Sequence, residues 1–164
     1  MEQTQKPLLF IDMDNVLVDF KSGLAKVSEE IKQQYACDEK GKPHYDDIPS
    51  IFALMDPMPG AIEAVHTLCE KYDLYILSTA PWHNPTAWYD KLEWVQRYFG
   101  SEKDSIFYKR LIISHHKNLN RGDFLIDDRR KNGADQFEGE LIEFGSPKFP
   151  DWPAVVEFLC NHQD

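Results

Sequence analysis

The sequence predicts an α/β fold of three layers, with a parallel five-stranded sheet and a small helical cap inserted near its start. Short, continuous apolar runs alternate with amphipathic segments and loops along the 164 residues. Such runs are typical of strands buried on both faces, as in a parallel sheet covered by helices. Polar residues directly follow most of these runs, and the length suits one domain with a small insertion.

The first strand is expected over residues 8–11, and two aspartates follow it. Aspartate disfavours strand interiors, so Asp12 and Asp14 should lie at the carboxyl end of the strand, where open α/β sheets bind ligands. Because the two aspartates are two residues apart, both side chains point to the same side of an extended chain. Two carboxylates that close need a cation or a shared proton. On its own, an Asp-x-Asp pair is as compatible with a capped strand end followed by a loop as with a functional site.

A long amphipathic helix is expected over residues 19–35, because apolar residues recur there at spacings of three and four. These residues are Phe20, Leu24, Val27 and Ile31. An aperiodic loop over residues 36–47 and a short apolar patch follow. We therefore expect residues 20–56 to form a small helical cap, and residues 1–19 and 57–164 to form the core domain.

The rest of the core is expected to alternate strands with helices or loops. Four further strands are predicted over residues 74–77, 111–114, 124–126 and 141–144. Helices are predicted over residues 61–72, over 88–99 with a stop at Gly100, and over 152–159 with Pro153 at the start. Carboxyl ends of parallel strands meet at one edge of a sheet, so the polar residues there should converge.

The polar residues at these strand ends form one constellation. Ser78 and Thr79 end the second strand, Lys117 follows the third, and Asp127 and Asp128 end the fourth. With the first-strand aspartates they make four acids, and hard oxygen ligands of this kind select Mg²⁺. A threonine hydroxyl, turn amides and a lysine can hold the oxygens of a phosphate. The constellation predicts phosphoryl chemistry.

These residues resemble the haloacid dehalogenase (HAD) superfamily of aspartate-nucleophile phosphatases. The stretch Asp12-Met13-Asp14-Asn15-Val16 matches its first motif, Thr79 its second, Lys117 its third and Asp127-Asp128 its fourth. The resemblance covers most of the chain. It implies a Rossmann-like HAD core in which the strands, numbered along the chain, lie in the order fifth, fourth, first, second, third.

Within the superfamily the chain is most similar to the 5'(3')-deoxyribonucleotidases. The supporting stretches are Val18-Asp19-Phe20, residues 59–65, Ser78-Thr79-Ala80-Pro81, residues 91–100 and residues 123–129. Three features depart from that family: Asn15 replaces a glycine, Ala80 replaces the serine of the animal enzymes, and the insertion at 20–56 is shorter. The shorter insertion affects the expected base selection, because it forms the cap over the substrate.

The resemblance implies a phosphoric monoester hydrolase of the 5'-nucleotidase type that works through an aspartyl-phosphate. Asp12 would be the nucleophile, and Asp14 would protonate the leaving group and then activate water. Mg²⁺ is the implied cofactor. Asp12 and Asp128 would bind it through carboxylates, Asp14 through its backbone carbonyl and Asp127 through a water.

Four residues are predicted to bind the phosphate: Thr79, Lys117, Asn15 and Ala80. Four more are candidates for the rest of the substrate: Phe20, Lys91, Phe52 and Trp82. Each has a plainer alternative. Phe20 could equally belong to the core, and packing in the core or cap is the favoured reading for Phe52 and Trp82. Lys91 could reach the phosphate or lie on a solvated helix face.

The amino-acid composition restricts the kinds of molecule that the protein is expected to bind. The net charge of −10 argues against binding to polymeric nucleic acid, while a small phosphomonoester such as a nucleoside monophosphate needs only a local cluster of cations. The three widely spaced cysteines suggest a reducing compartment and no zinc site. No apolar run approaches the roughly 20 residues that span a bilayer. We expect a cytoplasmic protein without a membrane partner; its oligomeric state is not predicted.

Two alternative functions remain at this level. One is a HAD phosphatase for a sugar phosphate or another small phosphoester. The other is a signalling receiver domain, which also gathers acids, a hydroxyl and a lysine around magnesium. A receiver accepts its phosphate on an aspartate at the third strand, whereas the third strand here ends at Ser114. Solvated positions are expected for His115, His116 and the run Arg129 to Lys131, although Arg129 could orient the neighbouring acids.

Overall fold

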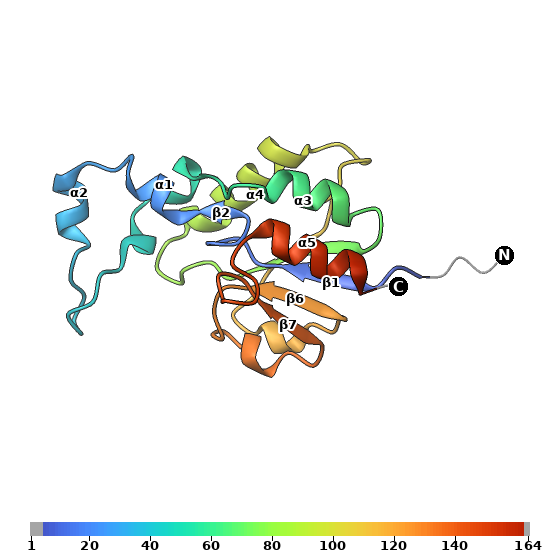
Figure 1. The fold of residues 1–164 in the computed structure, drawn as a ribbon. Helices are drawn as coiled ribbons and strands as arrows, with labels where there is room; N and C mark the ends of the chain where they lie inside the picture. The colour runs from blue at the N-terminus through green and yellow to red at the C-terminus, as the bar shows by residue number, and fades with distance from the viewer. Residues whose placement is uncertain (1–4, 163–164) are drawn as a thin grey trace.

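The computed structural model describes residues 5–162, and its core is one parallel five-stranded sheet (Figure 1). Its strands are β1 (Leu8–Ile11), β4 (Asp73–Ser78), β5 (Leu111–Ile113), β6 (Phe124–Asp127) and β7 (Glu140–Glu143). They lie in the order β5-β4-β1-β6-β7. The HAD resemblance implies this order, so the predicted strand order is confirmed. It makes β1 the central strand.

The registers bring the ends of the three central strands together. Ile11 at the end of β1 pairs with Ile76 of β4 and Ile126 of β6. One residue further, the Asp12 backbone N–H donates to the Ile126 carbonyl at 2.9 Å. Residues that follow β1, β4 and β6 therefore emerge side by side at one edge of the sheet.

The two faces of the sheet are covered differently. The longer helices α3 (Ala61–Leu68), α4 (Thr86–Phe99) and α5 (Trp152–Asn161) contribute to one large core on the first face. The second face has a smaller core, in which Phe10, Leu77 and Leu125 pack against Phe137 and the short 3-10 helix η4 (Ala134–Gln136). The chain thus forms three layers, and the layer on the second face of the sheet is thin.

The segment predicted as one helix over 19–35 contains two helices, α1 (Phe20–Leu24) and α2 (Glu29–Gln34), so that prediction is wrong. The apolar spacing continues across both, but Ser28 interrupts the helix. Its backbone is extended and its hydroxyl accepts from the Ile31 N–H at 3.3 Å, which makes Ser28 the N-cap of α2. Serine at this point favours a new helix start over a continued helix.

A short antiparallel ribbon that the sequence did not predict closes the base of the insertion. It pairs β2 (Val18–Asp19) with β3 (Asp56–Pro57). The chain between them carries α1, α2 and the 3-10 helices η1 (Tyr45–Asp47) and η2 (Ile51–Leu54), and projects from the core in Figure 1. The division into a cap over 20–56 and a core stays a prediction. Residues 1–4 and 163–164 of that predicted core lie outside the described residues.

Two further observations bear on the predicted environment of the protein. Cys37, Cys69 and Cys160 are all free thiols. Within residues 5–162, none of the helices combines the length and the hydropathy that a bilayer crossing requires.

Candidate active site

A small hollow of about 10 Å³ lies where the strand ends meet. Four different strands contribute to it, because Asp12 follows β1, Thr79 follows β4, Lys117 begins the 3-10 helix η3 (Lys117–Leu119) after β5, and Asp127 ends β6. The complete lining is Asp12, Asp14, Thr79, Lys117, Asp127, Arg129, Lys131 and Asn132. The structure thus brings together residues of all four predicted motifs. It adds Lys131, which was expected only as part of a solvated run, and Asn132, which the sequence did not single out.

Lys117 is buried between two carboxylates. Its Nζ lies 3.0 Å from Asp12 Oδ1 and donates a hydrogen bond to Asp127 Oδ2 at 2.5 Å. Burial raises the pKa of Asp12 to about 7, Lys117 opposes that rise, and the charges of Asp127 and Asp14 add to it. Burial alone would lower the pKa of Lys117, but Asp12 and Asp127 raise it overall, so the ammonium stays charged.

Asp12, Asp127 and Asp128 form an acidic cluster. Each offers a carboxylate oxygen, and these three atoms lie within 4.8 Å of one another. Among the described residues, the buried Oδ1 of Asp128 accepts no hydrogen bond. Burial raises the pKa of Asp128 to about 6, and the charge of Asp12 adds to the rise. Three converging carboxylates, with one oxygen that accepts no hydrogen bond and lies 3.9 Å from Arg129 Nε, fit a hard cation such as Mg²⁺ or Ca²⁺.

The Asp14 side chain lies outside that cluster and pairs with Lys91 of α4. Lys91 Nζ donates to both Asp14 oxygens, at 2.9 and 3.0 Å, and to Ser78 Oγ at 3.1 Å. Only 1% of Lys91 is exposed, so the solvated helix face considered from the sequence is wrong. Its burial could have been found from spacing, because Ala87 and Val95 lie four residues to either side on the same buried face.

The other residues predicted to bind phosphate occupy different places. Thr79 is half-buried in the hollow, where its hydroxyl donates to the Ser114 carbonyl at 2.7 Å. Ala80 is fully buried, and Asn15 lines a neighbouring cavity. The Asn15 backbone has a φ of 59°, in the left-handed region. Asparagine tolerates this conformation better than most residues, which explains how it can replace the glycine of the HAD motif.

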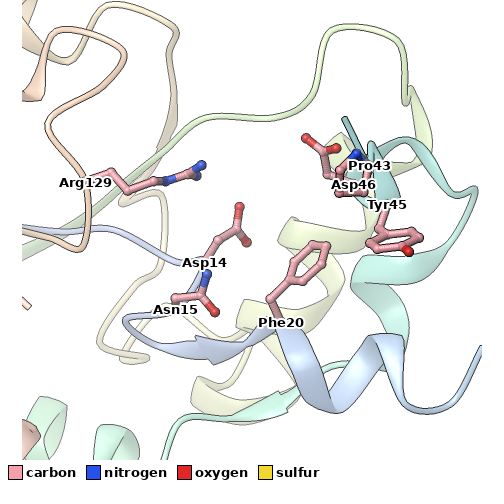
Figure 2. Close-up of a pocket in the computed structure, with 7 residues that line it drawn as sticks. All are labelled: Asp14, Asn15, Phe20, Pro43, Tyr45, Asp46 and Arg129. Carbon is pink, nitrogen blue, oxygen red and sulfur yellow. The ribbon is translucent and has the colours of Figure 1, made fainter. Parts of the chain in front are cut away.

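A larger cavity of about 300 Å³ opens beside the hollow, between the core and the insertion (Figure 2). It is lined by Asp14, Asn15, Phe20, Pro43, Tyr45, Asp46 and Arg129. Asp14 and Arg129 also line the hollow, so they mark the place where the two spaces meet. Arg129 is exposed, as expected, and still faces both spaces.

The insertion supplies both predicted and unpredicted residues to this cavity. Phe20, at the start of α1, was a candidate for substrate contact and lines it. Pro43, Tyr45 and Asp46 also line it and were missed, because their loop has no hydrophobic period that would indicate a face. No local signal in the sequence predicts which residues of such a loop turn inward.

Phe52 and Trp82 line neither space. Phe52 is buried and packs edge-on against Phe20, with ring centroids 6.1 Å apart, and the Lys91 ammonium lies 4.5 Å from its ring centroid. Trp82 is 76% exposed and its ring centroid lies 5.8 Å from that of His115, so packing of Trp82 in the core or cap is wrong. Phe52 therefore packs behind Phe20, which lines the cavity, whereas Trp82 is a surface residue that lines neither the hollow nor the cavity.

Comparison with known proteins identifies the family. Residues 6–151 match the family model described as "5' nucleotidase, deoxy (Pyrimidine), cytosolic type C protein". A protein of Vibrio phage KVP40, provisionally named 5'(3')-deoxyribonucleotidase, is 54% identical over 160 residues, covering 98% of this chain and 88% of the relative. The chain belongs to this deoxyribonucleotidase family.

More distant relatives agree. The human 5'(3')-deoxyribonucleotidase of cytosolic type is 26% identical over 179 residues, covering 94% of this chain and 80% of the relative. The 5'(3')-deoxyribonucleotidase of Bacillus subtilis is 28% identical over 157 residues, covering 87% of each. Family membership makes this deoxyribonucleotidase homologue a phosphoric monoester hydrolase of the nucleotide phosphatase type.

Solved structures confirm the fold. A HAD hydrolase from Bacillus subtilis, crystallised with bound magnesium, superposes with a TM-score of 0.58 at 13% identity, covering 95% of this chain and 99% of that one. A HAD-superfamily hydrolase of subfamily IA from Geobacter sulfurreducens gives a TM-score of 0.56 at 12% identity, covering 94% and 96%. At these identities the likeness concerns the fold alone, and it agrees with the predicted three-layer HAD core.

Proposed function

We propose that the protein is a Mg²⁺-dependent phosphatase that hydrolyses deoxyribonucleoside monophosphates through an aspartyl-phosphate on Asp12. One observation carries the proposal. Asp12 lies at the end of the central strand, beside the buried cation Lys117 and next to a cavity large enough for a nucleoside. Ligand sites of about 300 Å³ and above hold small organic molecules.

In the first step, an Asp12 oxygen attacks phosphorus and forms an acyl-phosphate bond, while the bond from phosphorus to the ester oxygen of the substrate breaks. Asp14 gives a proton to that oxygen as it leaves. Asp14 is suited to this role because it faces both the hollow and the larger cavity, where the leaving nucleoside would lie. The ion pair with Lys91 fixes its orientation.

In the second step, Asp14 takes a proton from a water that attacks the aspartyl-phosphate. Inorganic phosphate leaves, and Asp12 is regenerated as a carboxylate. In both steps Lys117 would hold the equatorial phosphoryl oxygens, where negative charge is spread in the transition state. The Thr79 hydroxyl would join it by turning its one O–H from the Ser114 carbonyl to the phosphoryl group. Both side chains line the hollow beside Asp12, the residue to which that phosphoryl group would bond.

The acidic cluster is the proposed metal site. Asp12 and Asp128 would bind Mg²⁺ directly, and Asp14 would add its backbone carbonyl. Asp127 already accepts hydrogen bonds on both oxygens, from Lys117 and from the Arg129 backbone N–H, which supports an indirect role through water. Bound Mg²⁺ would neutralise the phosphate and so allow an anionic nucleophile to approach it.

Deoxyribose preference is part of the proposal. The Phe20 ring lines the cavity next to Asp14, where the sugar of the substrate would lie. A ribose would press its 2'-hydroxyl against this apolar ring, and a buried hydroxyl without a partner costs roughly 1 to 3 kcal/mol. We expect kcat/KM for dUMP to exceed that for UMP by about tenfold to a hundredfold.

A substrate panel tests the function. Release of inorganic phosphate is measured for deoxyribonucleoside 5'-monophosphates, ribonucleoside 5'-monophosphates and sugar phosphates under identical conditions. Fastest turnover of the deoxyribonucleotides would support the proposal. A ratio near one between dUMP and UMP would remove the deoxyribose claim, and faster turnover of sugar phosphates would replace the nucleotide substrate with the alternative considered from the sequence.

A further inference from the structure

The wall of the larger cavity that comes from the loop of the insertion has few polar connections to the rest of the chain. The residues of this wall are Pro43, Tyr45 and Asp46. In Figure 2 they lie across the open space from Arg129. Within the described residues, three hydrogen bonds join the stretch 35–50 to residues outside the insertion, and all three end on Asn84 or Thr86. The polar connection of the wall therefore runs through these two side chains.

Asn84 is oriented by every partner that it has. Its side-chain amide donates to the Asp46 carbonyl at 2.8 Å and to the Ile48 carbonyl at 3.0 Å. Its oxygen accepts from the Thr86 hydroxyl at 2.6 Å, and that hydroxyl accepts from the Ser50 backbone N–H at 2.8 Å. Because carbonyls only accept, the amide nitrogen must face them. Only 1% of Asn84 is exposed, so water does not readily replace these bonds.

The loop that carries Asn84 also belongs to the phosphoryl site. It joins β4 to α4 and begins with Thr79, which lines the hollow. Helix α4 then supplies Lys91, the partner of Asp14. Asn84 itself lines neither the hollow nor the larger cavity. It therefore connects the wall to the hollow without being a surface of either space.

We infer that Asn84 is a positioning residue that sets the separation between this wall and the hollow. A substrate that fills both spaces needs them at a fixed separation, so Asn84 controls its affinity without touching it. A phosphate ion fills the hollow alone and needs no wall. This inference rests on the proposed function, which places the phosphate in the hollow and the nucleoside in the larger cavity.

Asn84→Ala tests the inference, because it removes both donors to the wall. We expect KM for dUMP to rise about tenfold with kcat within about threefold of wild type, while the Ki of inorganic phosphate changes by less than about twofold. The Ki is measured by competition with p-nitrophenyl phosphate. The contrast between the two ligands is the decisive readout, since a general loss of structure would weaken the binding of both.

The Thr86 hydroxyl gives a second, independent pair of variants. Thr86→Val keeps the shape of the side chain but removes the group that holds the Asn84 oxygen and the Ser50 N–H. It should raise KM for dUMP in the same way as Asn84→Ala. Thr86→Ser keeps the hydroxyl and should stay near wild type. If circular dichroism shows that Asn84→Ala does not fold, this pair decides the question.

Trp94→Phe is the matched control. The Trp94 indole also donates to a backbone carbonyl of the insertion, at Met55, with a distance of 2.9 Å, but Met55 does not line the cavity. Trp94→Phe should lower the melting temperature and leave the ratio of KM for dUMP to Ki for phosphate at the wild-type value. The same shift of this ratio in Trp94→Phe would mean that the ratio reports stability and not the position of the wall.

Hydrogen–deuterium exchange of the intact protein adds a readout that needs no activity. In Asn84→Ala, exchange should increase over residues 43–50 and stay unchanged in β1. Equal rises of KM and Ki, an unchanged KM, or unchanged exchange over residues 43–50 would overturn the role of Asn84 while nucleotide turnover stands. If the wild type hydrolyses no nucleotide, the proposed function fails, and the exchange result together with the same comparison on the best substrate of the panel decides the role of Asn84.

Discussion

Among the individual residues, Asp12 allows the sharpest test of the mechanism. Asp12→Asn keeps the size and shape of the side chain and its place beside Lys117, but an amide is not a nucleophile. We expect phosphate release to fall to background for every substrate, with an unchanged circular dichroism spectrum. If Asp12→Asn retained activity within about tenfold of the wild type, a loss of less than roughly 1.4 kcal/mol in transition-state stabilisation, Asp12 could not be the nucleophile.

For Lys91, a role in catalysis through Asp14 can be separated by experiment from a role in stability. Lys91→Met keeps much of the buried chain length but removes the group that fixes the orientation of Asp14, so the Asp14 carboxyl should be aimed less well at the leaving oxygen. We expect kcat for dUMP to fall by about tenfold or more while KM changes less. The loss should be smaller with p-nitrophenyl phosphate, whose leaving group needs little protonation.

Two measurements separate this effect from a general loss of stability. Thermal unfolding of Lys91→Met reports the cost of breaking a buried ion pair. In addition, adding Lys91→Met to Asp14→Asn should cost little further activity, because residues that act as a unit are not additive. Equal losses on both substrates, or full additivity, would show that Lys91 serves the fold and not Asp14.

At the level of elements, the predictability of each segment follows from its burial. The strand at Leu8–Ile11 and the strand at Phe124–Asp127 were found because both faces are buried, which leaves a continuous apolar run. The break between α1 and α2 was missed, because a local cap at Ser28 overrides a hydrophobic period that continues past it. The ribbon of β2 and β3 has two residues in each strand, too few to show any period.

Helix α4 contains a buried carboxylate, Asp90, whose ionised form destabilises the folded state. Asp90 is buried, and within the described chain its Oδ2 accepts no hydrogen bond. Burial raises its pKa above the ordinary 3.8, and Glu93 adds to the rise, while Thr86 partly offsets it. The folded state therefore binds this proton more tightly than the unfolded chain, and stability falls as pH rises above about 3.8.

Asp90→Asn should remove this cost. We expect a higher melting temperature than wild type at pH 7, with the gain shrinking as the pH is lowered toward the ordinary aspartate range. Glu93→Gln, which removes only the neighbouring charge, should give a smaller gain in the same direction. Unfolding curves at several pH values measure both. A melting temperature for Asp90→Asn that is lower at pH 7 would show that the carboxylate has a favourable partner in solution.

For the molecule as a whole, the grouping of residues at the strand ends was predictable, whereas the side of the cavity that the insertion lines was not. Strand order and direction place Asp12, Thr79 and Asp127 at one edge by a general rule of parallel sheets. The insertion between β2 and β3 is positioned by single long-range contacts instead. Examples are Trp94 Nε1 to the Met55 carbonyl at 2.9 Å and Asn84 to the Asp46 carbonyl at 2.8 Å. No local pattern encodes such contacts.

Metal binding is expected to change the stability of the whole domain. Three carboxylates converge at the end of the central sheet, so a cation bound there should stabilise the folded state by mass action. Mg²⁺ at about a hundred times its Kd should raise the melting temperature by roughly 5 to 10 °C for a chain of this size. EDTA should abolish both this shift and phosphate release. Ca²⁺ should also raise the melting temperature but inhibit turnover, because its larger and looser coordination shell disturbs in-line geometry.

Asp128→Asn supplies the control for this effect. It removes one charge from the cluster, so the metal-free variant should melt higher than the metal-free wild type, while the further rise with Mg²⁺ should largely disappear. Differential scanning fluorimetry with and without metal measures both changes on the same samples. An unchanged melting temperature in Mg²⁺ and in EDTA, together with undiminished turnover in EDTA and no metal found by elemental analysis, would mean that the three carboxylates hold no catalytic ion.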